Sequence, residues 1–121
     1  MQNRPLYTET WRQLASDKAM VFLSGPRQSG KTTLARTIAG EFPNHLHFNW
    51  DLDKNKVLLL KNPTFFQELN RKDASPPLIV FDEIHKYRRW KNYLKGIYDS
   101  FAEHYRFLVL GSGRLDIYQK G

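Results

Sequence analysis

Cysteine is absent from the 121 residues of this chain, and long apolar runs are absent as well. Without cysteine the chain can form neither a disulfide nor a thiolate metal site, so disulfide-stapled folds are excluded. No apolar run approaches the roughly 20 residues that a membrane-spanning helix needs. The first residues also lack the apolar core of a signal peptide. We therefore expect a cytoplasmic protein that has no membrane partner.

Acidic residues are few relative to basic ones. The chain has 12 Asp and Glu against 19 Lys and Arg, which gives a net charge of +7. An excess of positive charge suits a polyanionic partner such as a nucleotide, a nucleic acid or an acidic protein surface. Apolar residues make up 40% of the chain and charged residues 26%, which are ordinary globular values. At this length we expect residues 1–121 to form one domain.

Residues 24–33 read Ser-Gly-Pro-Arg-Gln-Ser-Gly-Lys-Thr-Thr and fit the phosphate-binding pattern G-x-x-x-x-G-K-[ST]. Gly25 and Gly30 allow backbone turns that aim successive N–H groups at an anion. A helix that begins at Lys31 adds its positive dipole end, and the Lys31 ammonium reaches the β- and γ-phosphates. The Thr32 hydroxyl is a predicted magnesium ligand. The residues expected to hold the nucleotide are Gly25, Pro26, Arg27, Gln28, Ser29, Gly30, Lys31, Thr32 and Thr33.

Strands and helices alternate along the chain, which predicts an α/β sandwich with a mainly parallel sheet. The predicted strands are residues 19–23, 45–51, 78–81 and 107–110. The predicted helices lie within 1–17 and over about 31–39, 57–60, 65–69 and 90–105. The run at 57–60 fits a strand as well as a helix. In the last helix, one stripe carries Trp90, Leu94, Ile97 and Phe101 and is expected to face the core.

Polar residues follow the two later strands at their carboxyl ends, where ligands of parallel sheets bind. Asp82 and Glu83 come directly after the apolar run at 78–81, and Ser112 follows the strand at 107–110. We expect Asp82 to bind magnesium and Glu83 to deprotonate an attacking water. Ser112 is expected to contact that water or the γ-phosphate.

Two rival interpretations of the chain remain open. Residues 86–95 mix five basic residues with three aromatic ones, a composition typical of surfaces on which nucleic-acid bases stack. A small phosphotransferase would use the same phosphate loop but pass the phosphate to an acceptor other than water. His45 and His47 share one face of a strand, but no carboxylate stands at ligand spacing, so we expect packing or exposed histidines there.

Three of these stretches resemble the AAA-type ATPase domain of bacterial and archaeal proteins that usually carry a C-terminal domain of unknown function. They are Gly25–Thr33, Phe81–His85 with Trp90 shortly after, and Leu108–Gly113. The resemblance implies a P-loop NTPase sandwich with the strand order 5-1-4-3-2, and ATP with Mg²⁺ as the cofactors. It departs from the family pattern at His85, where glutamine is often found, and at Gly113, where a second serine is usual.

Carried over by position, the resemblance implies that Lys31, Glu83 and Ser112 are catalytic and that Thr32 and Asp82 bind the metal. It also implies that strand 5 is missing, because the chain stops soon after the fourth predicted strand. We therefore expect residues 1–121 to be the N-terminal ATPase core of a longer protein. Its phosphate-loop strand would then lie at an exposed sheet edge, which invites self-association. We expect ATP binding by this fragment and hydrolysis by the full-length protein.

Overall fold

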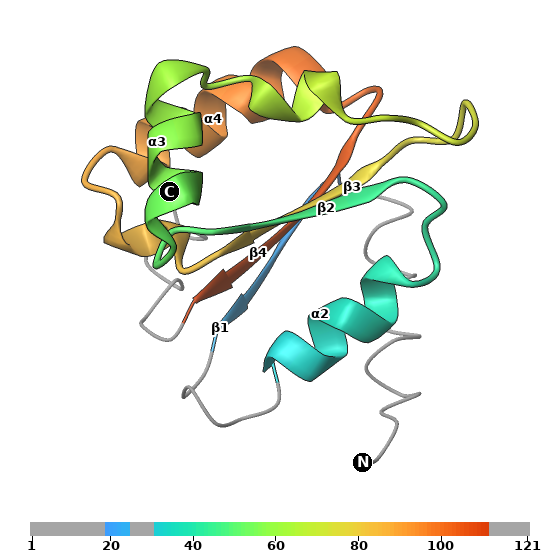
Figure 1. The fold of residues 1–121 in the computed structure, drawn as a ribbon, viewed down its shortest axis with the longest axis horizontal. Coiled ribbons are helices and arrows are strands. Elements are labelled where there is room, and N and C mark those ends of the chain that lie inside the picture. The colour runs from blue at the N-terminus through green and yellow to red at the C-terminus, as the bar shows by residue number, and fades with distance from the viewer. Residues whose placement is uncertain (1–18, 25–30, 112–121) are drawn as a thin grey trace.

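The computed structural model of the chain describes residues 19–24 and 31–111, apart from the side chains of Ser24, Lys31 and Thr32. Within these residues, four parallel strands form one sheet in the spatial order β1-β4-β3-β2 (Figure 1). This order confirms the expected sheet, with the strand that leads into the phosphate loop at one edge. The strands are β1 (Met20–Ser24), β2 (His45–Asn49), β3 (Leu78–Asp82) and β4 (Arg106–Gly111).

Helices connect the parallel strands and cover both faces of the sheet (Figure 1). They are α2 (Lys31–Ala39), α3 (Asp53–Lys61), α4 (Trp90–Phe101), and the one-turn helices η1 (Phe65–Glu68) and η2 (Ile84–Lys86). The ambiguous run at 57–60 is the C-terminal part of α3, and α4 ends four residues earlier than expected. The helix predicted within residues 1–17 lies outside the described residues. Among the helices of residues 31–111, none has the length and hydropathy needed to cross a membrane.

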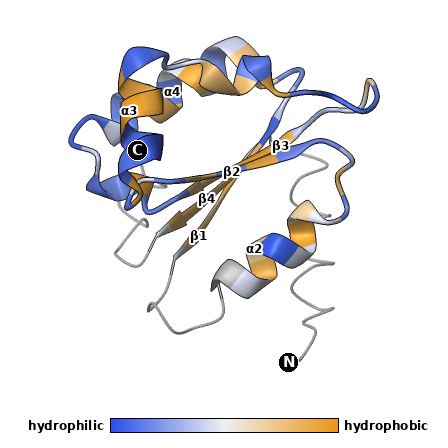
Figure 2. Cartoon of the chain, in the orientation of Figure 1, coloured by the Kyte–Doolittle hydropathy of each residue, from blue (hydrophilic) through white to orange (hydrophobic). Residues whose placement is uncertain are grey.

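Side chains alternate between the two faces of the sheet, because successive residues of a strand point to opposite sides. One apolar cluster joins Leu78, Val80, Leu108 and Leu110 to Ala35 and Ile38 of α2. A second cluster joins Ile79, Phe81, Phe107 and Val109 to α3, η1 and α4. Strands β3 and β4 are therefore hydrophobic through most of their length (Figure 2). The sheet is the middle layer of a three-layer sandwich.

Phe66 of η1 is the centre of the aromatic packing on the α3 and α4 side of the sheet. Its ring is fully buried. It makes edge-on contacts, with ring centroids 5.1–6.5 Å apart, to five other rings: Phe65, Phe81, Phe101, Tyr105 and Phe107. Because these rings come from β3, α4, β4 and the segment that joins α4 to β4, η1 ties elements that are distant in sequence to one core.

The substitution Phe66→Ala is expected to lower the free energy of unfolding by about 3–5 kcal/mol, because it removes a buried ring and leaves a cavity. Phe66→Leu should cost less, since more of the volume is kept. Urea denaturation followed by circular dichroism measures both changes. The exposed Tyr98→Ala is the control and should change stability by less than about 0.5 kcal/mol. A Phe66→Ala chain as stable as this control would contradict the packing described.

Candidate functional site

The carboxyl ends of the strands meet at one edge of the sheet, as expected for parallel strands. In the register, Ser24 of β1 lies beside Gly111 of β4, and Asp82 of β3 lies beside Leu110 of β4. Only β4 separates β1 from β3, so their ends are about 10 Å apart at the usual strand spacing. The start of the phosphate loop and the acidic pair Asp82-Glu83 therefore occupy the same edge.

Several of the predicted site residues lie outside the described residues. Residues 25–30 of the phosphate loop and Ser112 belong to these, and the side chains of Lys31 and Thr32 are not described. What the structure gives for the loop is its two ends. It leaves the sheet after Ser24, and the following helix α2 begins at Lys31, as predicted. Thr33 is half-buried in the first turn of α2, where its carbonyl accepts a hydrogen bond from the Thr37 hydroxyl at 3.1 Å.

Asp82 ends β3 on the face of the sheet that α2 covers. It follows Leu78 and Val80 at intervals of two residues, and both of these pack against α2. Asp82 is buried, and its Oδ2 lies 3.3 Å from Nε2 of His47 on the neighbouring strand β2. The sequence prediction missed this neighbour, because the two residues are 35 positions apart and meet only through the β2–β3 register.

Glu83 leaves the sheet in a left-handed backbone conformation, with φ 59° and ψ 25°. It is the single non-glycine residue with a positive φ in the described part of the chain. Such a conformation costs on the order of 1–3 kcal/mol and is found at functional sites. The Glu83 N–H donates to the Leu110 carbonyl of β4 at 2.8 Å, which fixes the turn against the sheet.

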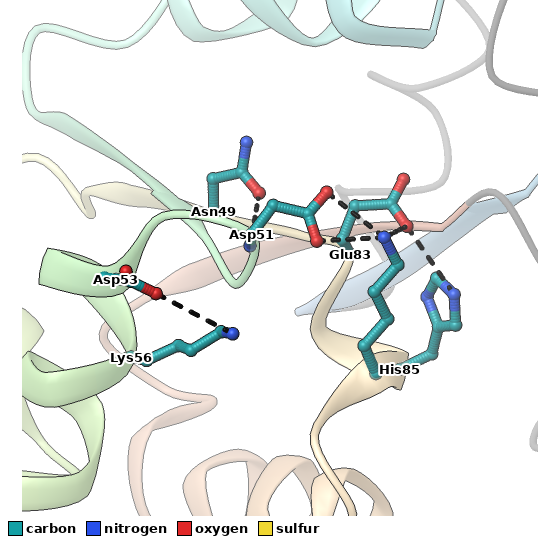
Figure 3. A network of polar contacts seen from close by, with 7 residues as sticks. Asn49, Asp51, Asp53, Lys56, Glu83 and His85 are labelled. Atoms are coloured by element: carbon teal, nitrogen blue, oxygen red, sulfur yellow. Dashed lines mark hydrogen bonds and ion pairs between the residues drawn. The ribbon is translucent and has the colours of Figure 1, made fainter.

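The Glu83 carboxylate is buried next to two basic side chains (Figure 3). Its Oε1 lies 3.6 Å from His85 Nε2 and 3.7 Å from Lys86 Nζ. Lys86 Nζ also donates to both carboxylate oxygens of Asp51, at 2.9 and 3.2 Å. The sequence prediction placed Lys86 only in the basic and aromatic stretch 86–95 and assigned no part to Asp51, and no spacing in the chain indicates their contact.

A metal at this edge would be held by Asp82 among the described residues. A buried carboxylate at a strand end is the hard oxygen ligand that Mg²⁺ prefers. Residues 19–24 and 31–111 contain no group of three or more His, Asp or Glu that would form a complete metal site by itself. His45, which shares the strand face with His47, is exposed, and its Nδ1 lies 3.0 Å from the Phe42 carbonyl. His45 and His47 therefore have separate protein partners.

The basic and aromatic stretch at 86–95 divides between core and solvent. Its aromatic side chains Tyr87, Trp90 and Tyr93 are half-buried and pack against the aromatic core. The Tyr93 hydroxyl donates to the Pro63 carbonyl at 2.7 Å. Burial, with a smaller contribution from Tyr87, raises the pKa of Tyr93 well above its usual range. The exposed residues are Asn92 and five basic ones: Lys86, Arg88, Arg89, Lys91 and Lys95. Core packing thus takes up part of each ring and leaves mainly basic side chains exposed on this stretch.

Comparison with known proteins gives one family. A family model described as an AAA domain matches residues 17–121. The matched range contains all four strands, the phosphate-loop sequence and the Asp82-Glu83 pair. No curated protein matches the chain.

The substitution Tyr93→Phe is expected to lower the free energy of unfolding near neutral pH by about 1 kcal/mol, because one side-chain hydrogen bond is lost. The folded-state pKa of Tyr93 is raised, so its contribution is complete below the unfolded pKa of about 10 and is lost as the pH rises further. Between pH 8 and pH 11, the free energy of unfolding measured in urea should decrease less for Tyr93→Phe than for the unaltered chain. An equal pH dependence of the two chains, or a loss no larger than that of the exposed Tyr98→Phe, would contradict this role of the Tyr93 hydroxyl.

Proposed function

The chain belongs to the AAA domain family, and from this premise we propose that it binds ATP with Mg²⁺ at the carboxyl edge of its sheet. We further propose that the full-length protein hydrolyses the bound ATP. The observation that carries the proposal is that the start of the phosphate-loop sequence and the two acids lie at the same edge of the sheet. The chain enters its phosphate-loop sequence at the end of β1, and the buried acids Asp82 and Glu83 lie at the end of β3, with β4 between the two strands.

The arrangement of the described residues suits a triphosphate. The helix α2 begins at Lys31 and so directs its N-terminal N–H groups toward the loop, where an anion is stabilised. Asp82 ends β3 on the α2 face of the sheet, where Leu78 and Val80 also point, and its carboxylate would be an oxygen ligand for a metal. We assign the magnesium ion to Thr32 and Asp82, where it would offset charge on the phosphates when bound. The remaining loop residues would donate their N–H groups to the phosphates.

Glu83 is our candidate for the general base of hydrolysis. Its backbone is held against β4, and its buried side chain directly follows Asp82, the proposed metal ligand, in the sequence. In the proposed reaction, Glu83 accepts a proton from water as the water oxygen attacks the γ-phosphorus in line with the leaving ADP oxygen. Lys31 would stabilise the charge on the transferred group, and Ser112 would orient the water. A buried acid beside the metal ligand favours water as the acceptor over a phosphotransferase substrate.

The substitution Lys31→Ala is expected to weaken ATP binding by about 100-fold, because it removes the ammonium that contacts the β- and γ-phosphates. Isothermal titration of ATP and ADP in the presence of Mg²⁺ measures the change. Lys95→Ala is the matched control, since it also removes one lysine and lies on the exposed face of α4. Equal affinities for Lys31→Ala and Lys95→Ala would show that the charge of the chain, rather than a phosphate site, attracts the nucleotide.

The substitution Glu83→Gln is expected to keep ATP affinity within about threefold while hydrolysis falls by at least about 100-fold. The amide keeps the shape of the side chain but cannot accept the proton from water. Phosphate release under saturating ATP, together with the titration above, separates the two effects. If Glu83→Gln hydrolysed ATP at the unaltered rate, another residue would have to be the base.

A further inference from the structure

We propose that Lys86 is a positioning residue for Glu83, and that its ion pair with Asp51 holds it in that role. The inference deepens the proposed function, because it assigns Lys86 a part in the hydrolysis that Glu83 would catalyse. Lys86 would not touch the nucleotide. It would act by fixing the Glu83 carboxylate through the oxygen Oε1.

The contacts of Lys86 join Asp51 and Glu83, which are labelled in Figure 3 and follow neighbouring strands at the carboxyl edge of the sheet. Its Nζ lies 2.9 Å from Asp51 Oδ1, in the turn after β2, and 3.7 Å from Glu83 Oε1, after β3. The shorter contact with Asp51 fixes the ammonium, and the longer contact places its charge beside Glu83. His85 Nε2 approaches the same Glu83 oxygen at 3.6 Å. Two basic side chains therefore lie within ion-pair distance of one oxygen of the proposed base.

Packing fixes the backbone near Asp51 and near Lys86, the two members of the ion pair. Ile84 at the start of η2 is fully buried, and Tyr87 after η2 stacks on Trp50 with ring centroids 4.7 Å apart. Trp50 directly precedes Asp51, and its N–H donates to the Asp82 carbonyl at 3.0 Å. The aromatic stack thus holds the turn that carries Asp51 beside the helix that carries Lys86. The position of the Lys86 ammonium is therefore set by the packing of η2 and of the turn after β2.

The exposed fractions of the Lys86, Asp51 and Glu83 side chains indicate what the ion pair between Lys86 and Asp51 does. The side chains of Lys86 and Asp51 are 37% and 36% exposed, so their ion pair contributes little to stability. The Glu83 side chain is only 8% exposed, and a buried carboxylate requires a compensating charge or donor nearby. Lys86 supplies such a charge to Glu83 while its ion pair with Asp51 adds little stability, so we assign it the positioning of Glu83. A base displaced by about 1 Å can lose on the order of 100-fold in rate.

The test compares Lys86→Met with Lys86→Arg in the full-length protein, which is expected to hydrolyse ATP. Lys86→Met removes the charge and keeps the length of the apolar stem, so the rate at saturating ATP should fall by at least about tenfold. The ATP dissociation constant should stay within about threefold. Lys86→Arg keeps a cation within reach of Asp51 and Glu83 and should recover most of the rate. Lys95→Met, which breaks the exposed ion pair with Asp99 on α4, is the matched control.

The outcomes separate this inference from the function on which it rests. If the unaltered full-length protein binds ATP but no condition yields hydrolysis, the hydrolytic part of the proposed function fails and this inference fails with it. If the unaltered chain hydrolyses ATP and Lys86→Met does so at the same rate, only the role of Lys86 is overturned. Urea unfolding of each variant shows whether a lower hydrolysis rate results only from a less stable fold. A rate loss with unfolding midpoints equal to that of Lys95→Met, and recovery by Lys86→Arg, supports the positioning role.

Discussion

The parallel register of β3 between β2 and β4 is the constraint on which the rest of the structure depends. Because β3 is buried along its whole length, its neighbours on both sides and both faces are fixed. The strand then ends in two acids, and the register carries them to the edge where β1 and β4 also end. A shift of one residue would turn Asp82 away from the α2 face and place an apolar side chain there. The position of the candidate site is therefore set by the packing of the sheet.

The sequence predicts the fold well where the pattern is local. Unbroken apolar runs predicted β3 and β4, and the phosphate-loop pattern predicted that a strand ends near Ser24 and a helix begins at Lys31. The run Val57–Leu60 was ambiguous, because four consecutive apolar residues suggest a buried strand. In the structure only Leu59 of this run is buried and the other three are exposed on α3. Periodicity has little information in so short a run.

The candidate site was predictable only in part. The motifs gave Asp82 and Glu83 at a strand end, and the structure puts them there, buried and next to each other. The contacts of His47 with Asp82 and of Lys86 with Asp51 depend on strand register and on the Trp50–Tyr87 stack, which no local pattern specifies. The left-handed turn at Glu83 was also not predictable, since glutamate has no preference for that conformation. The sequence did not predict which residues far apart in the chain contact one another.

The central claim is that one nucleotide with its metal lies between the phosphate loop and the ends of β3 and β4. The most direct test is an NMR experiment in which Mn²⁺ replaces Mg²⁺ in the complex with ATP, because the paramagnetic ion broadens nearby amide signals steeply with proximity. Strand β3 spans about 13 Å, so its two ends are distinguishable. The account predicts the strongest broadening at Asp82, Glu83 and Gly111, with much weaker broadening at Leu78 and Arg106. Broadening that is strongest within residues 86–95, or equal at both ends of β3, would contradict it.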